Sequence, residues 1–194
     1  QHDTNHGFLS LQDLQNYKAL ERDALCFSHA STFSTTKQVQ VCGVGPPSSG
    51  LITIGQIMGM LATDASNQLP PSAWTERNTA IPSTAWLHNY NEAARLAFAD
   101  RAMYVADPAF VNPPANDWSS LLKPSYLQQR ARLMATYRAP DVAAGNPGST
   151  ASSYAPMQDA VEYGTSHISV IDKDGNAVAM TTTIEAVFGS RLMV

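Results

Sequence analysis

The most informative stretch of the sequence reads Gly164-Thr165-Ser166-His167-Ile168-Ser169-Val170-Ile171-Asp172-Lys173-Asp174-Gly175-Asn176-Ala177-Val178-Ala179-Met180-Thr181-Thr182-Thr183-Ile184. Apolar and polar residues alternate in 165–171, and 177–184 is rich in residues that favour strands. Residues 172–176 lie between the two segments and have the Asp, Gly and Asn composition of a turn. This stretch therefore predicts a β-hairpin.

The length of the turn decides which residues of the two strands face each other. If residues 172–176 form the loop, Ile171 pairs with Ala177, and counting back along both strands places Thr165 opposite Thr183. Directly opposed side chains on a sheet are in contact. A register shift of one residue would separate the pair, so the prediction of two adjoining hydroxyls depends on this loop length.

Two adjoining threonines suit one kind of nucleophilic catalysis. A threonine hydroxyl is a weak nucleophile, but it becomes effective when threonine is the first residue of a chain and its own α-amine acts as the base. Here that arrangement requires a cut after Gly164, a residue type that permits a strained carbonyl to be presented. Threonine is also common in strands for structural reasons, which is the alternative interpretation of the pair.

Composition excludes several classes of function. The 194 residues include 12 Lys and Arg against 16 Asp and Glu, and 44% of residues are hydrophobic, which is typical of a globular protein. The basic residues are scattered, so no nucleic-acid partner is predicted. No apolar run approaches the roughly 20 residues of a membrane-spanning helix. His2 and His6 have no evident third ligand, so neither a metal nor a cofactor is predicted.

The remaining sequence indicates helices mixed with strands. Strands are expected at 19–27 and 37–44, and helices after Ser10, after Gly50, at 85–105 and at 123–135. Residues 64–84 are expected to form a loop and 139–160 a flexible surface segment. Asp100 and Arg101 are expected to form a structural ion pair or a helix-surface pair rather than a catalytic one. The residues expected to form the buried helix faces are Leu51, Ile54, Ile57, Met58 and Leu61, and then Leu87, Tyr90, Ala94, Ala97 and Phe98.

Two cysteines, Cys26 and Cys42, lie in strand-like segments that could pair. The spacing alone leaves two interpretations open, a pair of buried thiols or a single disulfide. A disulfide would indicate an oxidising compartment. We therefore expect a periplasmic or secreted protein whose signal peptide is not part of this chain.

Residues 164–179 resemble the processing site of the γ-glutamyltranspeptidase family, whose small subunit begins at the threonine of a Gly-Thr-Thr/Ser-His stretch. The resemblance extends in order from about residue 8 to residue 194. Its further matches are Pro46-Pro47-Ser48-Ser49-Gly50, Asn91-Glu92-Ala93, Ala99-Asp100-Arg101, Tyr104, Asp107-Pro108-Ala109-Phe110, Thr181-Thr182-Thr183-Ile184-Glu185 and Phe188-Gly189-Ser190.

This resemblance implies an α+β fold, the αββα sandwich of N-terminal-nucleophile hydrolases, of which the chain would be the middle portion. Residues 1–164 would be the C-terminal part of the large subunit, and 165–194 the N-terminal β-hairpin of the small subunit. The bond between Gly164 and Thr165 would be the cleavage site, Thr165 the nucleophile and Thr183 the second active-site threonine. Glu185 would bind the amino-acid end of the donor, with a solvated charge as the alternative.

The activity implied by the resemblance is the removal or transfer of a γ-glutamyl group, as from glutathione, through a γ-glutamyl-threonine ester. The expected partners are this small-molecule substrate and the remaining segments of the same precursor. Two alternatives are an acylase of the cephalosporin or another amide type on the same scaffold, and a catalytically silent fragment. The family's donor-binding arginine and oxyanion-hole glycines lie outside these residues, so the chain alone is expected to be inactive.

Overall fold

The computed structural model describes residues 7–30, 38–63, 81–148, 154–157, 164–184 and 189. Helices and two separate two-stranded antiparallel sheets make this an α+β chain. It divides into two compact units, Glu21–Met157 and the combination of Gln1–Leu20 with Gln158–Val194. Neither unit ends at the predicted subunit boundary after Gly164. That boundary concerns one peptide bond rather than packing, and it stays a prediction.

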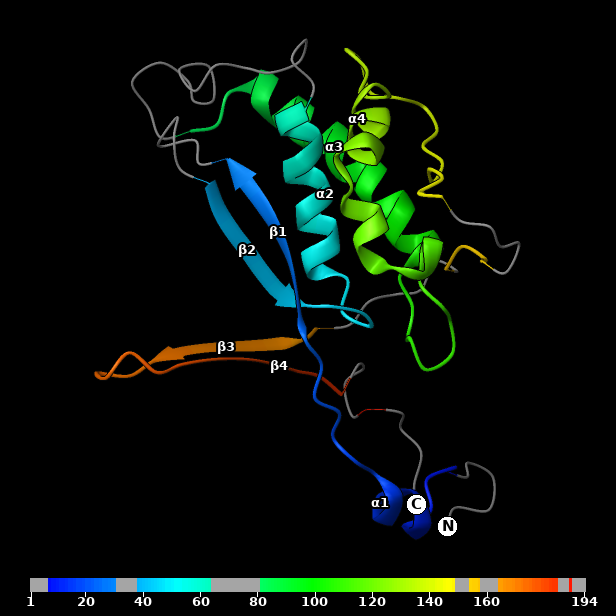
Figure 1. Cartoon of the computed structure of the whole chain (residues 1–194), viewed down its shortest axis with the longest axis vertical. Helices are drawn as coiled ribbons and strands as arrows, with labels where there is room; N and C mark the ends of the chain where they lie inside the picture. The colour runs from blue at the N-terminus through cyan, green and yellow to red at the C-terminus, as the bar shows by residue number, and fades with distance from the viewer. Residues whose placement is uncertain are drawn as a thin grey trace. The chain divides into compact units, whose positions relative to one another are not determined.

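The larger unit packs two helices and a strand pair around α2. Figure 1 shows α2 with the β1–β2 ribbon on one side and α3 and α4 on the other. The strands and helices of this unit are β1 (Ala24–Ala30), β2 (Gln38–Val44), α2 (Gly50–Thr63), α3 (Thr84–Tyr104) and α4 (Pro124–Ala131), and its two 3-10 turns are η2 (Pro114–Asn116) and η3 (Trp118–Leu122).

The predicted elements are found, with shifts at some ends. The strand expected at 37–44 begins one residue later, at Gln38, and the helix expected at 85–105 begins and ends one residue earlier, at Thr84 and Tyr104. The strand expected at 19–27 instead spans Ala24–Ala30, because pairing with β2 sets its limits. The helix expected at 123–135 ends at Ala131. Residues 64–80 of the expected loop lie outside the described residues.

The hydrophobic core lies between α2, α3 and α4. Met60 of α2, Ala97 of α3 and Leu127 of α4 are all buried in it. Close approach of α2 to α4 depends on Gly59, because a Cβ at this position would lie 2.4 Å from Leu127 Cδ1. A larger residue at position 59 would therefore force the two helices apart.

The buried faces of α2 and α3 differ in part from the expected ones. Ile54 of α2 is 52% exposed, and Leu87, Tyr90 and Phe98 of α3 are also exposed. The side of α3 that faces the core carries charged residues among the apolar ones. Its buried residues are Glu92, Ala93, Leu96, Ala97, Asp100 and Tyr104.

Asp100 is the centre of a buried polar cluster. Its Oδ1 lies 3.1 Å from Arg130 Nη2. Its Oδ2 accepts hydrogen bonds from Gln56 Nε2 at 2.9 Å and from Tyr126 OH at 2.7 Å. The expected pair of Asp100 with Arg101 is wrong, since the Arg101 side chain donates to Ser49 Oγ. Adjacent helix residues point in different directions, so Asp100 faces the core and is paired with α4 instead.

The segment 139–148, expected to be flexible, is instead bonded to α3 and α4. Gly145 donates its N–H to Asp100 Oδ1 at 2.8 Å, and its carbonyl accepts from Tyr104 OH at 2.5 Å. Arg130 Nη2 donates to the carbonyl of Ala143 at 2.9 Å. The Pro, Gly and Ala content of this segment signals a lack of helix or strand, and side-chain partners take over its backbone hydrogen bonds.

The smaller unit contains α1 (Leu11–Asn16), β3 (Ser166–Ile171) and β4 (Ala177–Thr182). The helix start predicted at Ser10 is confirmed. Ser10 and Asp13 form a reciprocal capping box, in which each side chain accepts from the backbone N–H of the other. In the part of the chain that the structure describes, no helix is both long and apolar enough to cross a membrane.

Candidate active site

The hairpin of β3 and β4 has the predicted register. Ile171 pairs with Ala177, and the ladder continues to the pair of Ser166 with Thr182. Extending this register by one step beyond both strands puts Thr165 opposite Thr183, a pair that the ladder itself does not include. The conditional prediction on loop length is therefore met, and the two threonines belong to the same face of the hairpin.

The turn that sets this register is held by Asp172. Asp172 Oδ1 accepts from the backbone N–H groups of Asp174 and Asn176, each at 2.9 Å, and Oδ2 accepts from Asn176 Nδ2 at 2.8 Å. The Asn176 side chain and backbone lower the pKa of Asp172, with smaller contributions from Asp174 and Gly175. Gly175 has φ of 86°, a conformation that favours glycine, so sequence and turn geometry agree.

The scissile bond predicted from the sequence lies at the open end of the hairpin. Gly164, Thr165 and Thr183 are all exposed. The Thr183 hydroxyl donates to the carbonyl oxygen of Gly164, with 3.4 Å between Thr183 Oγ1 and Gly164 O. The second threonine thus contacts the carbonyl group that the Thr165 hydroxyl would attack in the predicted cleavage.

The sequence suggested glycine at position 164 because this residue type permits a strained backbone, and the structure shows no such strain. Gly164 is absent from the residues with positive φ among those that the structure describes, and a Cβ built on it meets nothing within 4 Å. The local geometry of the uncut hairpin would therefore accept a side chain at this position.

His167 shares the polar face with the two threonines. Its Nδ1 lies 2.7 Å from Thr181 Oγ1, and its Nε2 lies 3.1 Å from Ser169 Oγ. Both ring nitrogens therefore have hydroxyl partners on the hairpin. The alternation of the sequence places these residues on one face, but it does not show that the imidazole bridges two hydroxyls.

The opposite face of the hairpin is apolar. Ile168 and Val170 of β3 and Val178 and Met180 of β4 point to this side, and each is about half exposed or more. Every residue in both strands is exposed. A two-stranded ribbon with one apolar face usually needs a further layer to cover it.

Glu185, predicted to bind the amino-acid end of a donor, lies outside the described residues. The structure therefore gives no geometry for it, and its role stays a prediction. The roles assigned to Thr165 and Thr183 also stay predictions, because position alone does not demonstrate catalysis.

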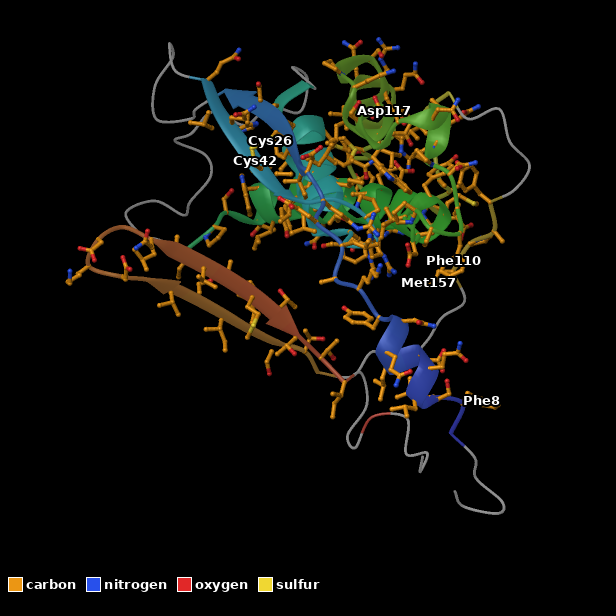
Figure 2. The ribbon with its side chains drawn as sticks, turned by 60° about the horizontal axis from the view of Figure 1, so that its bottom comes forward. Phe8, Cys26, Cys42, Phe110, Asp117 and Met157 are labelled. Atoms are coloured by element: carbon orange, nitrogen blue, oxygen red, sulfur yellow. A yellow bond between two sulfur atoms is a disulfide. The ribbon has the colours of Figure 1, made fainter. Side chains whose placement is uncertain are left out.

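Cys26 and Cys42 form a disulfide between β1 and β2. The two residues pair directly across the ladder, with Cα atoms 4.1 Å apart and a sequence separation of 16 (Figure 2). Of the two interpretations left open by the sequence, the structure therefore contains the disulfide. The bridge fastens the strand pair that packs against α2.

A cavity of about 420 Å³ lies beside this disulfide, between β1, α2 and the start of α4. Phe27, Gly55, Leu122 and Leu127 are among its lining residues, and none of the predicted site residues except Cys26 is. Within the described residues, no group of three or more His, Cys, Asp or Glu side chains is arranged to hold a metal ion. The chemistry predicted from the sequence therefore rests on the hairpin.

Comparison with known proteins places these features in one family. Residues 1–194 match the family described as gamma-glutamyltranspeptidase. The chain is 32% identical over 189 residues to a glutathione hydrolase proenzyme of Escherichia coli, covering 97% of this chain and 28% of that protein. It is 30% identical over 186 residues to an acylase ACY 1 proenzyme of a Pseudomonas species, covering 96% and 28%. The chain thus spans less than a third of these relatives.

Solved structures agree with the sequence comparison. A gamma-glutamyltranspeptidase from Pseudomonas nitroreducens superimposes with a TM-score of 0.52 at 26% identity, covering 66% of this chain and 33% of the other. The Helicobacter pylori enzyme gives a TM-score of 0.53 at 22% identity, which supports the fold alone. Together with the match over its full length, these findings show that the chain belongs to the gamma-glutamyltranspeptidase family.

Proposed function

We propose that the protein containing this chain hydrolyses or transfers γ-glutamyl groups, from glutathione or other γ-glutamyl amides, through an ester on Thr165. The observation that carries the proposal is the hairpin register, which brings Thr183 opposite Thr165 in a member of this family. A second hydroxyl there can hold the attacking oxygen in position. No cofactor is needed, because the α-amine of a chain-terminal threonine serves as the base.

The proposed activity requires a cut between Gly164 and Thr165. In the uncut chain the Thr165 nitrogen belongs to a peptide bond and cannot accept a proton. Cleavage would make residues up to 164 the end of a large subunit, and residues from 165 the start of a small one. An uncut chain of these 194 residues is therefore expected to be inactive.

The hairpin also supports a place inside the αββα sandwich of N-terminal-nucleophile hydrolases. Its apolar face, formed by Ile168, Val170, Val178 and Met180, is exposed in this chain, which spans only part of its relatives. Other segments of the same precursor would cover this face as an adjoining layer. The polar face would then remain open to the substrate, with Glu185 available for a donor's α-ammonium group.

A periplasmic or secreted location is proposed on the ground of the disulfide. Bridges such as Cys26–Cys42 persist in oxidising compartments and are rare in the cytosol of most organisms.

A second candidate function is that of an acylase on the same scaffold, which hydrolyses the side-chain amide of a cephalosporin or another amide. One relative of similar identity carries the name acylase ACY 1 proenzyme, so the family position alone does not decide between substrates. The two functions share the nucleophile and differ in the acyl group. A direct comparison of a γ-glutamyl anilide with a cephalosporin side-chain amide therefore separates them.

The experiment is made on the full-length protein and its Thr165→Ala variant. We expect the unmodified protein to appear as two chains on a denaturing gel, with Thr165 as a new N-terminus, and to turn over the γ-glutamyl anilide. Thr165→Ala should remain one chain and be inactive. Ser166→Ala is the matched control, since this hydroxyl is adjacent but faces the opposite side of the hairpin. Cleavage of Thr165→Ala at the same bond would refute the proposal.

A further inference from the structure

We infer that His167 is a positioning residue, which holds the N-terminal end of β3 in register with β4 after the chain has been cut. This inference rests on the proposed function, in which Thr165 becomes the first residue of a new chain. The observation that carries it is a side-chain contact between the two strands, in which His167 Nδ1 lies 2.7 Å from Thr181 Oγ1.

This contact lies close to the proposed nucleophile. His167 is two residues after Thr165, so the two side chains belong to the same face of the hairpin. Thr181 is the direct partner of His167 in the ladder, which ends one step later with the pair of Ser166 and Thr182. The imidazole therefore joins the two strands one step inside the end of the ladder.

A cut before Thr165 would loosen this end of β3. In the uncut chain, the backbone before Thr165 continues and restricts its movement. After the cut, Thr165 and Ser166 form a free chain end, and chain ends fray unless contacts tie them down. The proposed reaction requires the Thr165 hydroxyl to be held in one place. A bond across the strands beside the free end therefore raises the fraction of cut chains whose nucleophile is in position.

The imidazole suits this task because both of its nitrogens have hydroxyl partners. Nε2 lies 3.1 Å from Ser169 Oγ, so the ring is held between a hydroxyl of its own strand and one of β4. A neutral imidazole has one donor and one acceptor nitrogen, and a hydroxyl can take either role. Both contacts can therefore form with either tautomer, and the ring can join the strands without moving a proton.

The two contacts of the ring have different consequences for the chain end. The contact with Ser169 stays within β3, so it can orient the imidazole but cannot hold one strand to the other. The contact with Thr181 crosses to β4. Loss of the Thr181 contact should therefore free the chain end, whereas loss of the Ser169 contact should not.

The test uses the full-length protein and measures two rates. The first is cleavage of the precursor, followed on denaturing gels, and the second is release of the aniline from a γ-glutamyl anilide in a single turnover by cut chains. His167→Leu and His167→Asn form a matched pair, since both side chains branch at Cγ and only Asn keeps a polar atom at the place of Nδ1.

The expected effect is confined to the second rate. We expect His167→Leu to lower the maximal single-turnover rate roughly threefold to tenfold, which corresponds to the loss of one net hydrogen bond. His167→Asn should stay within about twofold of the unmodified protein, because the bond to Thr181 is kept. Both variants should be cut at nearly the normal rate, which also shows that they fold. The substrate concentration at half-maximal rate should not change, because His167 does not touch substrate in this proposal.

Variants of the two hydroxyl partners separate the two contacts. Thr181→Val keeps the shape and removes the hydroxyl, so it should lower the single-turnover rate as much as His167→Leu does. The double variant His167→Leu/Thr181→Val should be no slower than either single variant, because both changes remove the same bond. Ser169→Ala is the matched control and should leave the rate nearly unchanged.

Four results would overturn the inference. They are a normal single-turnover rate for His167→Leu, equal losses for His167→Leu and His167→Asn, a precursor of His167→Leu that stays uncut, and additive losses in the double variant. Thr165→Ala, run in parallel, separates the two proposals. If Thr165→Ala stays uncut while cut His167→Leu reacts at the normal rate, only the present inference fails, whereas cleavage of Thr165→Ala refutes the proposed function.

Discussion

Replacing Tyr126 with Phe tests the buried polar cluster without changing its shape. Tyr126 lies in the core with Ile52 and Leu121, and its hydroxyl donates to Asp100 Oδ2 at 2.7 Å. The variant keeps the ring and its packing. It removes one of the donors that surround the Asp100 carboxylate, so the loss of stability reports that hydrogen bond.

The expected loss follows from the charge of the acceptor. A hydrogen bond to a charged group contributes about 1.5–3 kcal/mol to stability, roughly twice a neutral one. Asp100 has no exposed surface and keeps its contacts with Gln56, Gly145 and Arg130 in the variant. We therefore expect Tyr126→Phe to lower the free energy of unfolding by about 1.5–3 kcal/mol.

The loss of stability caused by Tyr126→Phe should also depend on pH. Burial raises the pKa of Asp100, while Arg130, Gly145, Tyr126 and Gln56 act in the opposite direction. The folded protein therefore holds this proton more tightly than the unfolded chain, and stability falls as pH rises through the raised pKa. Removing the Tyr126 donor raises that pKa further. The difference in free energy of unfolding between the unmodified protein and Tyr126→Phe should be largest above the raised pKa, where Asp100 is ionised. It should shrink as pH falls below that pKa.

Urea unfolding of the full-length protein, monitored by near-ultraviolet circular dichroism, gives the free energies at each pH. Tyr137→Phe is the matched control, because Tyr137 is 84% exposed, and its effect should stay within about 0.5 kcal/mol. Two results would show that the Tyr126 hydroxyl does not stabilise an ionised Asp100. One is a loss of unfolding free energy below about 0.5 kcal/mol for Tyr126→Phe. The other is a loss that grows as the pH is lowered.

Two further predictions concern the strand pair and the turn. Replacing Cys26 and Cys42 with Ser should lower the free energy of unfolding by about 3 kcal/mol, because the bridge closes a loop with a sequence separation of 16. Adding a reductant to both proteins should abolish this difference. Thiols at Cys26 and Cys42 that alkylate freely without reduction would contradict the bridge. The pKa of Asp172 is lowered by its bonds to Asn176, so its contribution to the hairpin is present above the ordinary value of 3.8 and is lost as pH falls through the lowered pKa. Hydrogen exchange of the β3–β4 amides should therefore accelerate in that range, and an Asp172→Ala variant with the same pH profile would refute this.

The hairpin was predictable because local rules decide it. Alternation in 165–171, turn residues in 172–176 and a loop of fixed length are sufficient to give the register from Ile171 to Ser166. The capping box at Ser10 is equally local. The contact between Thr183 and the Gly164 carbonyl is the additional information, since it depends on side-chain geometry that no spacing rule contains.

The buried side of α3 was not predictable in the same way. Hydrophobic spacing favoured Leu87, Tyr90 and Phe98, which are exposed, whereas Glu92 and Asp100 are buried. A charged residue enters a core only when distant partners compensate it, and those partners are not visible in the local sequence. For Asp100, the partner Arg130 lies on another helix.

The attachment of residues 139–148 has a consequence for how this region tolerates mutation. Asp100, Arg130 and Tyr104 bind backbone atoms of Ala143 and Gly145, not their side chains. Substitutions at its exposed positions, such as Asp141 and Ala143, should therefore leave this anchoring intact. Position 145 should tolerate little change, because a Cβ there would lie 2.5 Å from Tyr126 OH and proline would remove the N–H that Asp100 accepts. Gly148, with φ of 97°, also favours glycine. A segment that forms neither helix nor strand can thus still be a fixed part of the fold.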